Sequence, residues 1–304
     1  MDSLIIQGGN PLRGKIKISG AKNAALPLMA CGLLLSKGSL ELTSFPKLAD
    51  TNSMATLLIN LGLKIEIKND NALIFGRPNN FNAPYDLVNK MRASILVLGP
   101  LLTRFGSARV SLPGGCSIGT RPVDLHIKAM KALGAKVKII KGYVEAQAPK
   151  EGLKGCIINF PKVSVGATEN TIMAASLAKG ETIITNAAQE PEIINLANCL
   201  NEMGAKISGA GTNEIKITGV KVLLGTKCKV ISDRIETGSY AIASLMTKGE
   251  LELNNAEPLY LSELNETLLK SGAIIKTSQD KIFVSSKSIL PASIFDKSRT
   301  SLIR

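Results

Sequence analysis

The sequence predicts an α/β fold (α+β repeats) that is assembled from four repeats of about 70 residues. Four glycines, Gly62, Gly134, Gly204 and Gly272, are 72, 70 and 68 residues apart, and each lies between an apolar-periodic stretch and an alternating strand pattern. A helix that stops at glycine and continues into a strand gives this pattern. Chance similarity between the segments is the alternative. The recurrence of the same pattern four times, at spacings that differ by only a few residues, argues against it.

The elements of the repeats can be assigned in order. The helices that lead into the four glycines are predicted at 54–61, 123–133, 193–203 and 261–269. A second helix precedes each of them and is expected to end at Lys37-Gly38, Phe105-Gly106, Lys179-Gly180 and Lys248-Gly249. Strands then follow at 39–42, 108–112, 181–184 and 250–253. Such units can bury their apolar faces against one another, with the helices inside.

Length and composition describe a globular protein with room for two ordinary domains: 304 residues, of which 45% are apolar and 20% charged. The net charge of +13 favours an anionic partner, either nucleic acid, an acidic membrane surface or a phosphorylated metabolite. The absence of Trp and the aromatic content of 4% disfavour a nucleic-acid partner, because single-strand binders stack bases on aromatic rings. The lysines are also scattered along strand patterns, which is typical of solvated faces.

Targeting and metal signals are weak. The amino terminus has no basic segment leading into an apolar one, and the most apolar window, 93–102, is too short to span a bilayer. We therefore expect a cytoplasmic protein without a membrane partner. Five widely spaced cysteines and one histidine support neither a disulfide framework nor a zinc site, so no metal or cofactor is expected.

A glycine-rich loop at 112–122 is the first candidate for chemistry. Cys116 lies five residues before Arg121 and close to a helix start that carries Pro122 and Asp124. A nearby cation and a helix amino terminus both favour thiolate over thiol. A glycine-rich turn with an incidental cysteine remains the alternative.

Three other segments place polar residues at predicted helix starts. Lys22 and Asn23 follow the turn at Ser19-Gly20, where an ammonium and an amide would suit a phosphate or carboxylate, although a solvated lysine is the simpler interpretation. In the segments 162–168 and 233–238, helix capping is the preferred role, with Ser164 or Thr168 as the cap of the first. Arg92 lies in an apolar setting, which predicts a buried arginine with an anionic partner.

These motifs together resemble the UDP-N-acetylglucosamine 1-carboxyvinyltransferase family from residue 19 to about residue 285. The matching segments are 19–23, 83–87, 91–94, 111–119, 121–126 and 233–238. The resemblance implies an inside-out α/β barrel of the enolpyruvyl transferase type, with two domains and six repeats. It implies transfer of the enolpyruvyl group of phosphoenolpyruvate to the 3-hydroxyl of UDP-N-acetylglucosamine, with release of phosphate, in peptidoglycan biosynthesis. The sister family that makes 5-enolpyruvylshikimate-3-phosphate fits the 114–116 loop and the 121–126 segment less well.

The resemblance also implies roles for individual residues. Cys116 would protonate the methylene carbon of phosphoenolpyruvate and could be held as a covalent adduct. Phosphoenolpyruvate would be bound by Lys22, Asn23 and Arg121. The UDP-sugar would be bound by Asn23, Arg92, Arg121, Pro122, Val123, Asp124, Leu125, Lys162, Val163, Ser164 and Val165.

Measured against the family, the chain is expected to hold a complete first domain at 22–229 and an incomplete second domain formed by 1–21 and 230–288, followed by an irregular tail at 289–304. The family's catalytic carboxylate in a Pro-Thr-Asp context is missing, Asp296 has no matching context, and two of six repeats are missing, so a carboxyl-terminal truncation is expected. Two hypotheses stay open: an active transferase, completed by a second chain that supplies the missing repeats, or an inactive remnant that at most binds UDP-sugar.

Overall fold

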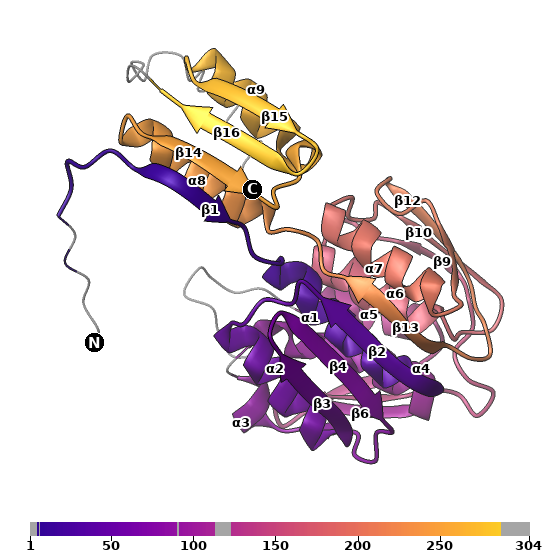
Figure 1. The fold of residues 1–304 in the computed structure, drawn as a ribbon. Helices are drawn as coiled ribbons and strands as arrows, with labels where there is room; N and C mark the ends of the chain where they lie inside the picture. Colours follow the sequence, from indigo (N-terminus) through magenta and orange to yellow (C-terminus); the bar gives the residue numbers. More distant parts are fainter. Residues whose placement is uncertain (1–4, 6, 90, 113–122, 287–304) are drawn as a thin grey trace. The chain divides into compact units, whose positions relative to one another are not determined.

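The computed structural model describes residues 5, 7–89, 91–112 and 123–286. The chain divides into two compact units, shown in Figure 1. The larger unit comprises Gly20–Ile231, and the smaller unit combines Met1–Ser19 with Ser232–Arg304. The repeats share one arrangement, a helix, a strand, a second helix and a hairpin, together with one further strand that pairs in parallel with the first of these strands.

The second repeat shows this order without interruption. Its four strands form one sheet in the order β5-β6-β8-β7, in which only the β5 and β6 pair is parallel. Two short helices, α3 (Tyr85–Val88) and η2 (Arg92–Val97), precede the first long helix. The other elements are β5 (Asn82–Ala83), α4 (Leu98–Phe105), β6 (Ser107–Ser111), α5 (Asp124–Ala132), β7 (Lys136–Ile140) and β8 (Tyr143–Gln147).

The third repeat has the same order, with its sheet arranged β11-β12-β10-β9. Its parallel pair is formed by β9 and β10. The elements are β9 (Ile157–Asn159), α6 (Val165–Ala175), β10 (Glu181–Thr185), α7 (Pro191–Glu202), β11 (Lys206–Ser208) and β12 (Glu214–Thr218).

The first repeat takes its parallel strand from the far end of the unit. Strand β13 (Leu224–Lys229) follows the third repeat and pairs with β2 (Lys37–Thr43), so that Leu224 lies opposite Lys37. This pairing closes the larger unit on itself, and the sheet order is β13-β2-β4-β3. The remaining elements are α1 (Lys22–Cys31), η1 (Gly32–Leu34), α2 (Ala49–Asn60), β3 (Leu63–Lys68) and β4 (Asn71–Gly76).

The smaller unit contains one repeat, and its parallel strand comes from the amino-terminal segment. Strand β1 (Arg13–Lys17) pairs with β14 (Glu250–Asn254), in the sheet order β1-β14-β16-β15. The other elements are α8 (Arg234–Met246), η3 (Pro258–Leu261), α9 (Ser262–Lys270), β15 (Ile274–Ser278) and β16 (Lys281–Ser285).

The predicted glycine stops are confirmed. Gly62, Gly134, Gly204 and Gly272 have φ angles of 104°, 96°, 105° and 81°, the left-handed region in which a side chain would be strained. Each follows the end of one of the helices α2, α5, α7 and α9. The upstream helices, by contrast, do not extend to the Lys-Gly pairs: α1, α6 and α8 end at Cys31, Ala175 and Met246. Lys37-Gly38 already belongs to β2, so the predicted boundary was wrong there.

The two units differ in how completely they bury their helices. In the larger unit, eight of the ten residues of α1 and nine of the eleven residues of α6 are buried, whereas its strands alternate between buried and exposed side chains. The helices therefore form the interior and the sheets the outside (Figure 1). In the smaller unit, α8 buries only four of its thirteen residues. Among the described residues, no helix is both long and apolar enough to cross a membrane.

Candidate functional site

The start of α1 holds the first pair of predicted site residues. Ala21 is extended, and the helix begins at Lys22 without a side-chain cap, so the amino-terminal N–H groups keep their capacity for an acceptor. The Lys22 ammonium lies 2.9 Å from a carboxylate oxygen of Asp50, which belongs to the first turn of α2. Asn23 is exposed. The predicted position of Lys22 and Asn23 at a helix start is confirmed.

Arg92 is the first residue of η2 and was expected to be buried, but it is only half-buried. Its charge acts on His126, which lies in the first turns of α5 and is 3% exposed. The pKa of His126 is lowered from 6.5 to about 4, mainly by desolvation and also by the nearby positive charge of Arg92, whereas the negative charge of Asp124 raises it. The imidazole is therefore neutral at physiological pH.

Asn170 joins His126 to two other elements. Its side-chain nitrogen lies 3.0 Å from Nδ1 of His126 and donates a hydrogen bond to the backbone carbonyl of Ile95, also at 3.0 Å. Its side-chain oxygen accepts a hydrogen bond from the backbone N–H of Gly99 at 2.7 Å. One buried amide of α6 thus ties together η2, α4 and α5.

The start of α6 supplies the third predicted segment. Ser164 caps the helix and accepts a hydrogen bond from the backbone N–H of Ala167 at 3.4 Å, as predicted. Thr168 is not a cap, because its hydroxyl is buried and accepts a hydrogen bond from the backbone N–H of Ala188 at 3.2 Å. Lys162 and Val163 are exposed, and Val165 is half-buried.

Gly166 allows the α6 start to approach the histidine. A Cβ atom added to Gly166 would lie 3.3 Å from Cε1 of His126 and 3.5 Å from Nε2. The structure therefore brings three predicted segments together, those of Arg92, of Asp124 and of Ser164 to Val165. Val123 and Leu125 are buried and pack in the core of the larger unit. Cys116, Arg121 and Pro122 lie outside the described residues.

Two buried polar residues of α6 were not predicted. Glu169 is 4% exposed, and desolvation raises its pKa well above the ordinary value, with further contributions from the negative charges of Glu192 and Glu190. Asn170 is fully buried. The one sequence signal was the polar run at 168–171 inside an otherwise apolar helix, a pattern that usually indicates a hydrogen-bonded network rather than a solvated face.

A free cysteine is usually a small core residue, and Cys31, Cys199 and Cys228 are buried in this way. Burial is the main cause that raises the pKa of the Cys31 thiol. Cys156 is half-buried, and its thiol donates to the carbonyl of Ala132 at 3.2 Å.

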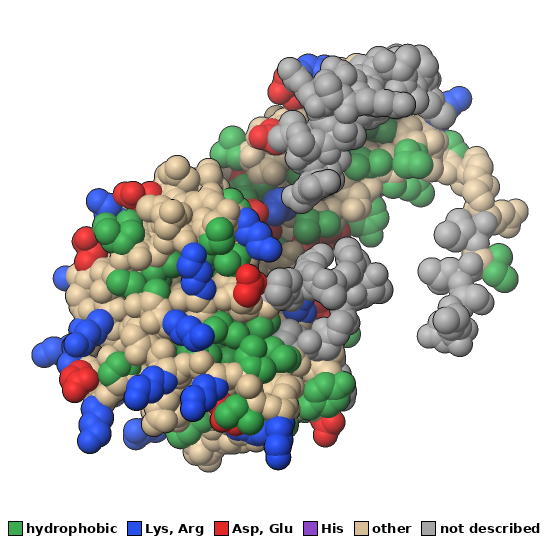
Figure 2. All heavy atoms as spheres, turned by 180° about the vertical axis from the view of Figure 1, so that it is seen from behind, with side chains coloured by type: hydrophobic (Ala, Val, Ile, Leu, Met, Phe, Trp, Pro, Cys, Tyr) green, Lys and Arg blue, Asp and Glu red, His purple; other side chains and the backbone are tan. Residues whose placement is uncertain are grey.

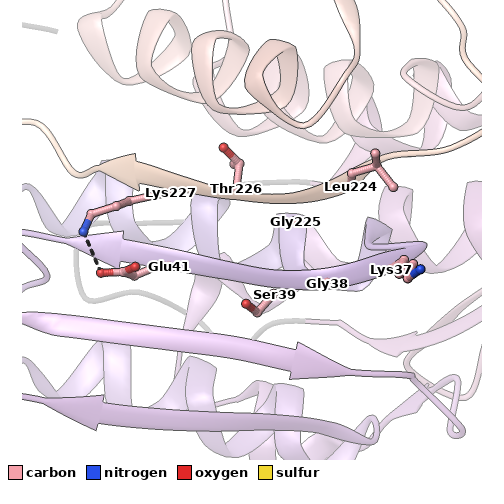
Figure 3. Close-up of a pocket in the computed structure, with 8 residues that line it drawn as sticks. All are labelled: Lys37, Gly38, Ser39, Glu41, Leu224, Gly225, Thr226 and Lys227. Atoms are coloured by element: carbon pink, nitrogen blue, oxygen red, sulfur yellow. Dashed lines mark ion pairs between the residues drawn. The ribbon is translucent and has the colours of Figure 1, made fainter.

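A shallow groove of about 480 Å³ lies elsewhere, over the paired strands β2 and β13 (Figure 3). Its shape has a local cause, because Gly38 and Gly225 have no side chains and the register shifts between Leu224 and Thr226. The ion pair between Lys227 and Glu41, at 3.0 Å, lies along it. None of the predicted site residues lines this groove, so we do not place the functional site there.

Basic side chains do not form a single patch on the face of the larger unit that Figure 2 shows. On the face shown in Figure 2, Lys and Arg side chains are spread over the larger unit among acidic and apolar ones. This distribution agrees with lysines that lie on the solvent-exposed outer faces of the sheets.

Comparison with solved structures identifies the fold. The enolpyruvyl transferase NikO from Streptomyces tendae matches 92% of this chain and 67% of its own with a TM-score of 0.82, at 20% identity. An EPSP synthase from Acinetobacter baumannii matches 93% of this chain and 66% of its own, with a TM-score of 0.70 at 21% identity. The chain has the fold of the enolpyruvyl transferases, which confirms the predicted fold class.

Sequence comparison identifies the family. A model of the family described as EPSP synthase (3-phosphoshikimate 1-carboxyvinyltransferase) matches residues 6–297. A UDP-N-acetylglucosamine 1-carboxyvinyltransferase from Rhodospirillum centenum is 54% identical over 90% of this chain, and one from Acidiphilium cryptum is 52% identical over 94%. The chain belongs to this family of carboxyvinyltransferases and, within it, to the UDP-N-acetylglucosamine 1-carboxyvinyltransferases. It spans 66% and 68% of the length of these two relatives.

Proposed function

We propose that the chain serves the transfer of the enolpyruvyl group from phosphoenolpyruvate to the 3-hydroxyl of UDP-N-acetylglucosamine, with release of phosphate, in peptidoglycan biosynthesis. The observation that supports this most is the convergence of Arg92, Asp124 and the Ser164 cap around His126. A half-buried guanidinium and the amino terminus of α6 both favour an anion, which suits the diphosphate of a nucleotide sugar. Helix α1, which begins at Lys22, packs against η2 and α6. The ammonium group of Lys22 suits the negative charge of phosphoenolpyruvate.

In this proposal Cys116 donates a proton to the methylene carbon of phosphoenolpyruvate while the sugar oxygen bonds to the adjacent carbon and releases its hydroxyl proton to solvent. The Cys116 thiolate then takes a proton back from the new methyl group as phosphate leaves, which restores the double bond. Arg121 and Pro122 complete the two substrate sites.

Cys116→Ala is expected to reduce turnover by about 10² to 10⁴-fold, the usual contribution of a positioned general acid, and to leave the affinity for UDP-N-acetylglucosamine unchanged. Phosphate release from phosphoenolpyruvate and UDP-N-acetylglucosamine measures the first, and calorimetric titration measures the second. Cys156→Ala is the control, because it removes a half-buried thiol outside the candidate site. If the native chain binds UDP-N-acetylglucosamine but releases no phosphate, the hypothesis of an inactive chain that only binds the UDP-sugar is favoured.

Arg92→Met is expected to weaken binding of UDP-N-acetylglucosamine by about 10-fold or more, because a hydrogen bond to a charged group contributes about 1.5 to 3 kcal/mol. Arg77→Met is the control, since it removes an exposed cation of the same unit outside the candidate site. Calorimetric titration at two salt concentrations separates a specific contact from general charge attraction, which salt screens. Equal affinities of the two variants would contradict the proposed site.

We also propose that two further repeats of the same kind cover helix α8, either within a longer chain or in a second chain. Ile235, Ile242 and Met246 are 55%, 41% and 71% exposed and lie at positions i, i+7 and i+11 of this helix, so they share one face. In the larger unit, the corresponding helices α1, α4 and α6 pack against sister repeats and are largely buried.

The apolar face can be tested by coexpression with the part of the Rhodospirillum centenum relative that this chain does not match. We expect a complex that purifies as one species, and we expect Ile242→Lys to abolish it because a charge would then be buried without a partner. Ile139→Lys, at a 56% exposed residue of β7, is the control. A complex that tolerates Ile242→Lys would exclude this face as the interface.

A further inference from the structure

The side-chain amide of Asn170 has only one possible orientation. Its oxygen lies 2.7 Å from the backbone nitrogen of Gly99, which can only donate, and its nitrogen lies 3.0 Å from the carbonyl oxygen of Ile95, which can only accept. These two backbone groups therefore fix which atom of the Asn170 amide is the oxygen and which is the nitrogen. The second hydrogen of the Asn170 nitrogen points to Nδ1 of His126, 3.0 Å away.

This orientation determines the protonation of the histidine. Because Nδ1 faces a donor, it must be the acceptor, and the proton of the neutral ring must be on Nε2. We propose that Asn170 is a positioning residue that holds His126 in this tautomer, so that Nε2–H is a fixed, uncharged hydrogen-bond donor beside the start of α6. The ligand part of this inference, an acceptor oxygen of the nucleotide sugar, rests on the proposed function.

The surroundings of the ring support a donor role. His126 is 3% exposed, and no described residue accepts a hydrogen bond from its Nε2. Gly166 lies beside that nitrogen, since a Cβ atom added there would be 3.5 Å from Nε2. Protonation is opposed by burial and by Arg92, which together lower the pKa of His126, whereas Asp124 favours it. Among the described residues the Nε2–H group therefore has no acceptor, and it can donate to an acceptor on a ligand.

The tautomer can be measured directly, because His126 is the one histidine of the chain. Nitrogen-15 NMR of the histidine-labelled chain should show an unprotonated Nδ1 and a protonated Nε2 at neutral pH. Asn170→Asp places a carboxylate oxygen opposite Nδ1, so the proton should move to Nδ1 or the ring should become charged. A proton on Nδ1 in the native chain would overturn the proposal, and this measurement needs no variant.

Asn195→Asp is the matched control for a merely structural effect. Asn195 is also a buried amide, and it donates to the carbonyl of Lys229 at 3.0 Å and accepts from the backbone N–H of Ile231 at 3.3 Å. This variant should also destabilise the larger unit while leaving the NMR signals of His126 unchanged. If both variants shift the His126 signals alike, the change is a general loosening of the fold and the positioning role is wrong.

Binding of UDP-N-acetylglucosamine tests the ligand part. On binding, the Nε2 proton signal of the native chain should shift, and Asn170→Asp should weaken affinity by at least about 3 to 10-fold more than Asn195→Asp does, as expected for one misdirected hydrogen bond. Equal affinities of the two variants would overturn the ligand part while Arg92→Met still tests the proposed function. Absence of binding by the native chain would reject the proposed function and the ligand part together, and the tautomer assignment would still be decided by NMR.

Discussion

Gly20→Ala is expected to lower the free energy of unfolding of the larger unit by about 3 kcal/mol or more. A Cβ atom at this position would lie 1.9 Å from the carbonyl oxygen of Ser44, and real Cβ atoms essentially never come within 3.0 Å of a heavy atom of a residue that is not their neighbour in the chain. Neither backbone segment can move away easily, because each is held by a hydrogen bond of 2.7 Å. The N–H of Ala21 donates to the carbonyl of Ile231, and the N–H of Phe45 donates to the carbonyl of Asp70. Urea denaturation with a probe in the larger unit measures the loss.

The effect should extend to the site, since Gly20 lies two residues before Lys22. Any backbone shift that relieves the clash moves the start of α1 and the ammonium held by Asp50. Gly8→Ala is the control, because nothing lies within 4 Å of a Cβ atom there and its stability should stay within about 0.5 kcal/mol. Equal stability of the two variants would show that the backbone at Gly20 does not approach the carbonyl oxygen of Ser44 this closely.

The second large effect concerns pH, through two buried groups that act in opposite directions. The pKa of His126 falls from 6.5 to about 4 on folding, so the unfolded chain binds the proton more tightly. Stability from this group is complete above pH 6.5 and is lost as the pH falls through 4, by about 3 kcal/mol in all at about 1.4 kcal/mol per pH unit. The pKa of Glu169 is raised well above 4.5, so its contribution is complete below pH 4.5 and is lost as the pH rises.

Above pH 4.5 the two groups change the stability in opposite directions, and two variants can separate their contributions. Glu169→Gln should leave a stability that rises with pH by about 1.4 kcal/mol per unit, and His126→Asn should leave one that falls by a similar amount. Urea denaturation at closely spaced pH values gives the slope of the free energy of unfolding against pH. These slopes, and not the absolute stabilities, are compared between the variants. The double variant should lose both of these slopes. If the native chain and all three variants gave parallel stability curves, the assigned burial of both groups would be contradicted.

Local features of the sequence predicted much of the site's framework. Lys22 and Ser164 were placed at helix starts and are found there, because turn and capping signals act within a few residues. Arg92 was expected to be buried and is half-buried. The roles of Cys116 and Arg121 stay predictions based on family resemblance, since both lie outside the described residues.

The sequence by itself determined the repeats, their glycine stops and the order of helices and strands, because each depends on a local period or on a left-handed glycine. Only the tertiary structure decided which distant strands complete each sheet, as in the pairing of β13 with β2 and of β1 with β14. It alone also decided that Asn170 meets His126 and that Glu169 is buried. These contacts join residues far apart in the chain, and burial depends on what packs around a residue rather than on its neighbours in sequence.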